Sequence, residues 1–188
     1  MSETFDYLQN NSLSRAQLSD VPTEFYNIHY GDVLIRYSEV FDASADEPTY
    51  IKDDSMLSKM PSSLLRNGDI VMADAAEDET VGKCCEIAGL QGNKAVSGLH
   101  TIPLRPKEKH AVGFLGYYMN SNSYHNQLLP IMQGTKVSSI SKSAISETII
   151  SAPASIEEQE KIGTYLRKLD NLITLHQRNL FVIEKPFC

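Results

Sequence analysis

Residues 155–185, SIEEQEKIGTYLRKLDNLITLHQRNLFVIEK, carry the clearest structural signal in the sequence. Ser155 followed three residues later by Glu158 forms the capping box that starts a helix, and Glu157 adds negative charge at the positive end of the helix dipole. Leu and Ile residues, with one His, then recur at alternating intervals of four and three, which is the a/d spacing of a coiled coil. The seam positions are Ile162, Leu166, Leu169, Ile173, His176, Leu180 and Ile183. The pattern predicts one long amphipathic helix from Ser155 to about Lys185.

The apolar face of this helix needs a partner. Leu172, Leu175 and Val182 broaden the stripe, so the helix can pack on more than one neighbour. No other stretch has a heptad pattern of comparable length, which favours a partner helix from another chain. Burying the Leu and Ile side chains of the seam yields on the order of 10 kcal/mol, whereas association costs roughly 4 to 15 kcal/mol. We therefore expect only marginal self-pairing from the seam. His176 is expected to be a tolerated, partly exposed position, with a pH switch as the less favoured alternative.

Residues 26–118 show short apolar runs separated by Gly, Pro, Asp and Asn, the pattern of β-strands. A Gly-Asp pair precedes an apolar run twice, at Gly31-Asp32 and at Gly68-Asp69. The repeated Gly-Asp pair indicates either a turn-then-strand motif that occurs twice or simply a dipeptide that is common in turns. The spacing of the runs predicts a compact, mostly antiparallel sheet or barrel rather than βαβ units.

The spacing of apolar residues changes after residue 111. Residues 112–119 approach helical spacing and predict a helix of about three turns. The Ser- and Thr-rich stretch that follows is expected to begin as a loop, to form a short helix at 142–145 and then a strand at 148–151 that Pro153 terminates. The predicted fold is α+β: a mostly β globular domain with small helices over residues 1–153, and a long coiled-coil-type helix over residues 154–188.

Composition limits the function classes. The net charge of −7 and pI near 5.2 argue against holding nucleic acid by global electrostatics, so any DNA contact is local or shared with a basic partner. The first residues lack the regions of a signal peptide and no eighteen apolar residues run together, so we expect a cytoplasmic protein.

The three cysteines, Cys84, Cys85 and Cys188, form no CxxC pair and have no histidine at metal spacing, so no metal site is predicted. In a strand, alternation would send one of the adjacent thiols inward and the other outward. A buried thiol acting as a small hydrophobe is favoured over a catalytic one. The sequence also shows no glycine-rich cofactor loop, no P-loop and no methyltransferase tetrapeptide.

Several stretches resemble the DNA-specificity subunit of type I restriction-modification systems: IHYGDVLIRY (28–37), NGDIVMADAAEDETVGKCCEI (67–87), SGLHTIPLRP (97–106), GYYMNS (116–121), QGTKVSSISKSAISETIISAP (133–153) and SIEEQEKIGTYLRKLDNLITLHQRNL (155–180). The similarity runs from about Leu13 to Val182. It implies a target-recognition domain that reads one half of a bipartite DNA site, followed by a helical spacer. Full-length members have two such domains and two helical regions, so this chain resembles a half-size or truncated subunit.

The resemblance also implies partners. A modification subunit using S-adenosylmethionine and a restriction subunit using ATP and Mg²⁺ would supply the chemistry, so the chain itself is expected to be non-catalytic and to hold no cofactor. Two copies, or this chain and another specificity subunit, are expected to pair through the helix in an antiparallel arrangement.

Base reading needs polar groups on exposed loops or groove-facing strands, and phosphates need cations, hydroxyls or amides. The Ser/Thr-rich stretch is the best phosphate-contact candidate, with a hydroxyl-rich helix-capping turn as the alternative. Ser97 and His100 are candidates to face DNA, although a buried histidine bonded to backbone is favoured. Asp74 is a candidate acceptor for a cytosine amino group, with a solvated acid as the alternative. Arg36 and Tyr37, at the end of the first predicted Gly-Asp strand, are candidates to enter a DNA groove, with exposure to solvent as the alternative. The predicted DNA-contact residues are Arg36, Tyr37, Asp74, Ser97, His100, Gln133, Thr135, Lys136, Ser138, Ser139 and Lys142.

Two other classes remain open. A cysteine-dependent enzyme would use Cys84 or Cys85 with His100 or His125, against which the neighbouring acids Glu79 and Glu86 argue. A non-DNA-binding oligomerisation or adaptor protein would use the helix alone and would leave the β domain unexplained.

Overall fold

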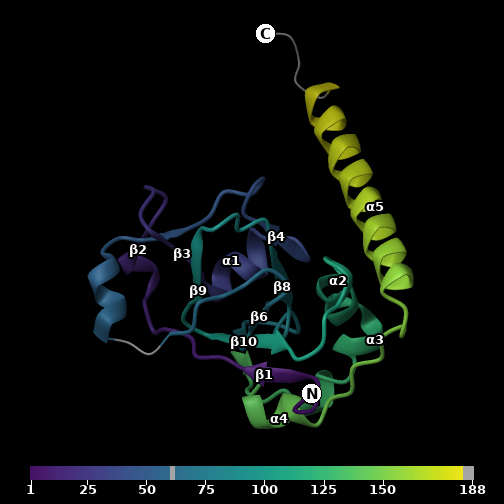
Figure 1. Cartoon of the computed structure of the whole chain (residues 1–188), viewed down its shortest axis with the longest axis horizontal. Helices are drawn as coiled ribbons and strands as arrows, with labels where there is room; N and C mark the ends of the chain where they lie inside the picture. The colour runs from purple at the N-terminus through teal and green to yellow at the C-terminus, as the bar shows by residue number, and fades with distance from the viewer. Residues whose placement is uncertain (60–61, 184–188) are drawn as a thin grey trace.

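The computed structural model describes residues 1–59 and 62–183, and in these ranges the strands form three sheets (Figure 1). The largest has five strands in the order β1-β10-β6-β8-β4. These are β1 (Phe5–Tyr7), β10 (Thr101–Pro106), β6 (Ile70–Ala73), β8 (Cys84–Ala88) and β4 (Val40–Asp42). Only the β4–β8 pair of this sheet is parallel within the described residues.

The five-stranded sheet is covered on both faces. Along β6, Ile70 and Met72 join one core cluster, whereas Val71 joins the other. In β8, Cys84 and Cys85 divide between the same two clusters, and both are completely buried. The expectation that one thiol would point outward is therefore wrong, because alternation here distributes side chains between two covered faces. The interpretation of both as small buried hydrophobes holds.

A second sheet has four strands in the order β2-β5-β3-β9, and a third contains two. Their bounds are β2 (Leu18–Ser19), β5 (Tyr50–Ile51), β3 (Phe25–Ile28), β9 (Lys94–Ser97), β11 (Ser138–Ser139) and β7 (Ala75–Ala76). The β3–β9 pair is parallel, and β2–β5, β3–β5 and β7–β11 are antiparallel. Mostly antiparallel pairing confirms the predicted α+β class. Two short 3-10 helices, η1 (Arg15–Gln17) and η2 (Asp54–Lys59), flank the four-stranded sheet.

The first Gly-Asp pair does not begin a strand. Residues 30–35 form helix α1 (Tyr30–Ile35), for which His29 is the N-cap, its Nδ1 accepting a hydrogen bond from the amide of Gly31 at 3.2 Å. Asp32 in the first turn is buried and accepts from Arg15 at 2.7 Å. The expected strand is wrong here because the three-residue apolar run Val33-Leu34-Ile35 shows no reliable period. A contact with Arg15, distant in sequence, fixes the buried acid in helical geometry.

Other helices pack on the face of the five-stranded sheet opposite to the face that α1 covers. They are α2 (Phe114–Asn120), α3 (Asn122–His125), η3 (Leu129–Ile131) and α4 (Lys142–Ser146). The last confirms the helix expected at 142–145, and the first confirms a helix near 112–119 but has seven residues, about two turns rather than the expected three. The strand expected at 148–151 is not formed: Gln127 donates to the carbonyl of Ile149 at 3.0 Å and accepts from its amide at 2.9 Å. A side chain thus satisfies the backbone groups that a neighbouring strand would have paired.

Helix α5 (Ile156–Ile183) confirms the long helix that the sequence predicted. The amide of Glu158 donates to Ser155 Oγ at 3.4 Å, which is one of the two hydrogen bonds of a capping box. Figure 1 shows α5 beginning beside α2 and α3 and extending well beyond the rest of the chain. The predicted pairing positions Leu180 and Ile183 lie outside the residues whose side chains the structure describes. Within the described ranges, no helix is long and apolar enough to cross a membrane.

Candidate nucleic-acid interface

Asp74 joins two segments that are far apart in sequence. Its amide donates to the carbonyl of His100 at 3.0 Å, and its own carbonyl accepts from the amide of Ile140 at 2.9 Å. The β7–β11 pairing sets Ala75 opposite Ser139 and so continues the same connection. Backbone pairing therefore brings Asp74, His100 and the start of α4 onto one surface.

His100 is the most informative side chain on that surface. It is half exposed, its backbone has φ 54°, and its Nδ1 lies 3.3 Å from Asp74 Oδ1. A side-chain-bearing residue rarely adopts a left-handed conformation, and such strain is concentrated at functional sites. The expectation of a buried histidine bonded to backbone is wrong, because the turn between β9 and β10 projects the ring toward solvent and toward Asp74.

The environment of this pair suits recognition of a base edge. Burial raises the pKa of Asp74, while His100 and Lys142 oppose that shift by stabilising the carboxylate. When His100 Nδ1 carries the proton and donates to Asp74, the lone pair on Nε2 is left to accept a hydrogen bond. The exocyclic amino groups of adenine and cytosine are the hydrogen-bond donors in the major groove of DNA.

Residue Tyr30, which the sequence reasoning missed, completes this group. Its ring lies between His29, at a centroid distance of 4.6 Å, and His100, at 5.3 Å in an edge-on arrangement. Tyr30 opens α1, so the placement of its ring depends on residues 30–35 being helical. An aromatic residue next to a Gly-Asp turn was the available signal, and it is a weak one.

The segment 133–142 forms the neighbouring edge of the surface. Gln133 and Ser139 exchange backbone hydrogen bonds of 2.9 and 2.7 Å, so the residues between them form a tight hairpin loop. Gly134 has φ 114°, and a Cβ there would lie 2.0 Å from the carbonyl oxygen of Val137, so only glycine fits. Thr135 and Lys136 are exposed at the tip.

Both interpretations of this segment have structural support. Ser141 caps α4 by accepting from the amide of Ala144 at 3.1 Å, as a helix-capping turn would. Ser138 and Ser139 form β11, and Lys142 extends back to the carbonyl of Leu8 at 3.3 Å. Ser139 nevertheless pairs with Ala75, next to Asp74, and the charge of Lys142 acts on the Asp74 carboxylate, so this end of the segment borders Asp74 and His100 as a phosphate-contact loop would require.

Three predicted contact residues lie elsewhere. Tyr37 is buried against Phe41, and burial raises the pKa of its phenol. Ser97 is completely buried, with its Oγ 2.6 Å from the hydroxyl of Thr101. Tyr37 and Ser97 therefore belong to the interior, because other segments of the chain cover both side chains. Arg36 ends α1 and is bound to Asp32 at 3.4 Å, away from the His100 surface in its contacts.

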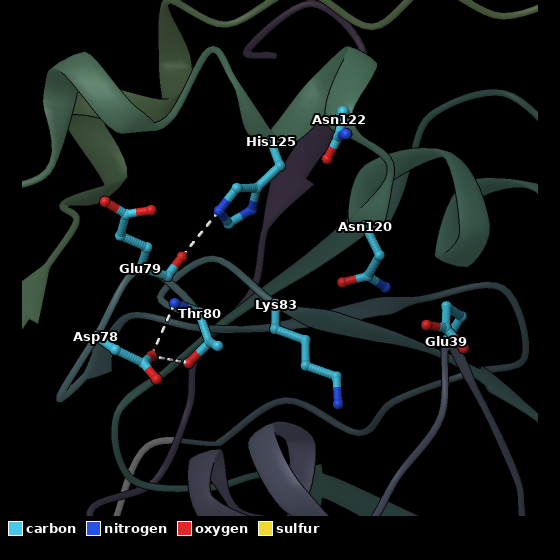
Figure 2. Close-up of a pocket in the computed structure, with 8 residues that line it drawn as sticks. All are labelled: Glu39, Asp78, Glu79, Thr80, Lys83, Asn120, Asn122 and His125. Carbon is cyan, nitrogen blue, oxygen red and sulfur yellow. Dashed lines mark hydrogen bonds between the residues drawn. The ribbon is translucent and has the colours of Figure 1, made fainter.

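A separate cleft of about 560 Å³ opens beside α3. Figure 2 shows it lined by Glu39, Asp78, Glu79, Thr80, Lys83, Asn120, Asn122 and His125. His125 Nε2 lies 2.9 Å from the carbonyl oxygen of Glu79, and the Lys83 ammonium donates to the carbonyl of Leu34. Three carboxylates line this cleft, so it would repel a phosphate backbone and is a poor nucleic-acid surface.

The geometry also disfavours cysteine chemistry. Burial raises the pKa of Cys84 and of Cys85, which opposes formation of the reactive thiolate. His125 is bonded to backbone and His100 to Asp74. Among residues 1–59 and 62–183, no group of three or more His, Cys, Asp or Glu is arranged to hold a metal ion.

Comparison with solved structures establishes the fold. A chain from a study of complex assembly and conformational transition of the type I R-M system superposes with a TM-score of 0.59 at 15% identity, covering 95% of this chain and 39% of that one. The S subunit of a type I restriction-modification system from M. genitalium gives 0.57 at 15% identity, covering 94% and 40%. The HsdS subunit from Thermoanaerobacter tengcongensis gives 0.57 at 16% identity, covering 94% and 37%.

The chain thus spans about two-fifths of the length of the solved structures that it matches. No curated protein sequence matches it. The sequence model for the type I restriction modification DNA specificity domain matches residues 51–185, which is more than half of the chain. On that match, and with the fold in agreement, the chain belongs to the family of type I restriction-modification DNA specificity domains.

Proposed function

We propose that this chain reads one half of a bipartite DNA site for a type I restriction-modification complex in the cytoplasm. The observation that carries the proposal is the surface made by Tyr30, Asp74, His100 and Lys142 on a domain of the DNA-specificity family. A modification subunit with S-adenosylmethionine and a restriction subunit with ATP and Mg²⁺ supply catalysis in this proposal. The chain itself contributes recognition.

In this proposal the surface makes two kinds of contact, one with base edges and one with phosphates. His100, held by Asp74 and flanked by Tyr30, presents a directional hydrogen-bonding group and an aromatic edge to bases. Lys136 and Thr135 at the hairpin tip offer a cation and a hydroxyl to phosphate. Because the whole chain carries a net charge of −7, this local placement of cations matters more than the total.

Pairing through α5 is the second part of the proposal. Beyond the domain, the helix exposes large apolar side chains at Leu169, Leu172, Ile173 and Leu175. A second copy or another specificity subunit, lying antiparallel, would cover them and present two recognition domains to one duplex. The described part of the seam is short, so contacts with the modification subunit would reinforce the pairing.

Selection of random duplexes by the chain together with its modification partner tests the recognition role. The wild type is expected to enrich one short half-site, and His100→Ala to lose preference at one or more base pairs of that half-site. His125→Ala is the matched control, since it removes the same side chain from the acidic cleft and should leave the selected sequence unchanged. No enrichment by the wild type at low salt, or the same half-site for wild type and His100→Ala, would overturn the assignment.

An oligomerisation or adaptor role is the alternative that the exposed seam favours. It predicts self-association with no sequence preference in the same selection. The selected DNA therefore separates the two functions, whatever the oligomeric state.

A further inference from the structure

One stripe of α5 packs on the recognition domain: the predicted seam residue Ile162 lies against the core, so it is not free to pair with a second helix, and polar contacts accompany it. Gln159, only 3% exposed, is its first member: its Oε1 accepts from the amide of Ala111 at 3.0 Å and its Nε2 donates to the carbonyl of Pro153 at 2.8 Å. The bond to Ala111 holds the first turns of the helix against the loop that precedes α2, and the bond to Pro153 ties them to the segment that leads into α5.

Gly163, one helical turn later, allows close approach. A Cβ at this position would lie 3.3 Å from both the amide nitrogen of Phe114 and the carbonyl oxygen of Val112. The start of α2 is itself held from β8, because the buried carboxylate of Glu86 accepts from the amides of Gly113 at 2.7 Å and Gly116 at 3.1 Å. Helix α5 therefore rests on a part of the domain that is anchored to the central sheet.

The stripe ends at Asp170, where Tyr117 Oη donates to Asp170 Oδ2 at 2.6 Å. From residue 171 to residue 177, every described side chain is exposed. Among the described residues, the Tyr117–Asp170 hydrogen bond is thus the last contact before the helix projects freely. Tyr117 lies on α2, so this bond connects the anchored helix to the projecting one.

We propose that the Tyr117–Asp170 hydrogen bond is a positioning contact that sets the direction in which α5 leaves the recognition domain. The consequence for DNA rests on the proposed function, in which α5 determines the separation of two half-sites. Gln159 and Asp170 are about 16 Å apart along the helix, and Ile183 is about 36 Å from Gln159. A lateral shift of about 1.5 Å at Asp170 therefore becomes about 3 Å at Ile183, close to the ~3.4 Å step between base pairs.

The contact precedes the exposed part of the pairing seam. Asp170 is about 100° around the helix from Leu169 but about 40° from Leu166 and about 60° from Ile173, so contact and free seam are separated along the helix rather than on opposite faces. The described side chains beyond Asp170, through residue 177, remain available to a second helix. A change at Tyr117 should alter direction without removing any side chain from the seam.

Distances between two spin labels test the contact on the whole chain. Labels on cysteines introduced at the exposed positions Asn93 and Gln177, in a Cys188→Ser background and diluted with unlabelled protein, report the orientation of α5 within one copy. Tyr117→Phe should broaden the distance distribution, and Asp170→Ala should do the same. Asp170→Asn, which keeps an acceptor oxygen, should restore a narrow distribution.

The matched control is Tyr118→Phe, which removes a neighbouring hydroxyl that accepts from the amide of Ser151 rather than from α5. It should leave the distribution narrow. Equal widths for wild type, Tyr117→Phe and Asp170→Ala would overturn the inference. Equal broadening by Tyr118→Phe and Tyr117→Phe would also overturn it, since the effect would then be general loosening.

Selection from duplexes with two random blocks and spacers of varied length gives the functional readout. Tyr117→Phe should select the same half-sites as the wild type, while its preference for one spacer length falls about 2- to 10-fold, the factor contributed by one hydrogen bond. If the wild type enriches no half-site, the proposed function fails, and the spin-label distances still decide the positioning contact. An unchanged spacer preference beside a narrow distribution refutes the contact while leaving recognition intact.

Discussion

Arg105 on β10 and Asp69 before β6 form a two-bonded ion pair, with Nε to Oδ1 at 2.9 Å and Nη2 to Oδ2 at 2.7 Å. Asp69 is 2% exposed, and its carboxylate also accepts from the amide of Arg66 at 2.8 Å. The pair joins adjacent strands of the central sheet, so its integrity bears on the core that carries the recognition surface.

Replacing Asp69 with Ala should lower the free energy of unfolding by about 3–5 kcal/mol, because Arg105 would keep a partly buried charge without its partner. Urea unfolding followed by circular dichroism measures the change. Lys107→Ala is the control: its ion pair with Asp6 is 3.8 Å long and exposed, so its loss should cost less than about 1 kcal/mol. Similar costs for the two variants would contradict the role given to Asp69.

The histidine cap of α1 makes stability depend on pH. Burial lowers the pKa of His29 from 6.5, with Arg15 adding to the shift and Asp32 opposing it. Because the folded chain then binds fewer protons than the unfolded chain below pH 6.5, this contribution is present above pH 6.5 and lost as the pH falls through the folded pKa. Unfolding measured from pH 7.5 downward should show the loss in the wild type and a smaller one in His29→Asn, which retains a cap. An equal slope for the two proteins would exclude the cap as the cause.

The buried thiols should resist modification. Burial raises the pKa of both Cys84 and Cys85, and each is completely enclosed. Iodoacetamide at neutral pH should therefore label these positions slowly in the folded chain and rapidly in urea, as peptide mass spectrometry would show. Rapid labelling of either residue in the folded chain would instead support a reactive cysteine.

An acidic residue in the exposed seam should prevent pairing. Ile173 is 55% exposed in this chain and would be covered by the partner helix, so Ile173→Asp would place a charge in an apolar interface. Sedimentation at tens of micromolar should show a lower average mass for Ile173→Asp than for the wild type, with unchanged helicity. Asn171→Asp adds the same charge at an exposed polar position and should leave the mass unchanged. A monomeric wild type, alone and with the modification subunit, would rule out pairing.

The exposed hairpin lysine should contribute affinity without specificity. Lys136→Ala should weaken binding about equally to cognate and non-cognate duplexes and reduce the slope of log affinity against log salt by about one. Fluorescence anisotropy at several salt concentrations measures both quantities. Lys161→Ala, an exposed cation on α5, serves as the control. A change confined to the cognate duplex would place Lys136 against a base rather than a phosphate.

The two Gly-Asp pairs show what a short motif can predict. Both aspartates, Asp32 and Asp69, are buried at 2% exposure and bound to arginines, so the repeated pair reflects a shared use of a buried acid. The segments that follow differ, since residues 30–35 form a helix and residues 70–73 form a strand. Six or fewer apolar residues carry too little periodicity to distinguish the two, and contacts from distant residues decide between them.

The candidate surface was predictable only in part. Asp74, His100 and the 133–142 segment were identified by residue type, and their proximity comes from the hydrogen bonds of Asp74 and the β7–β11 pairing. Tyr37 and Ser97 were of suitable type but are buried. Residue type predicts what a side chain can do, whereas burial depends on which other segments cover it.

The sequence by itself determined the long helix that follows Pro153, because a capping box is local and a heptad pattern repeats over many residues. It also identified the family, through the resemblance of several stretches and the match over residues 51–185. The tertiary structure alone decided that residues 30–35 are helical, that His100 faces Asp74 and Tyr30, and that α5 packs on the domain up to Asp170 and is exposed from residue 171 to residue 177. Each of these depends on a contact between residues that are far apart in the chain, and no local pattern specifies such a contact.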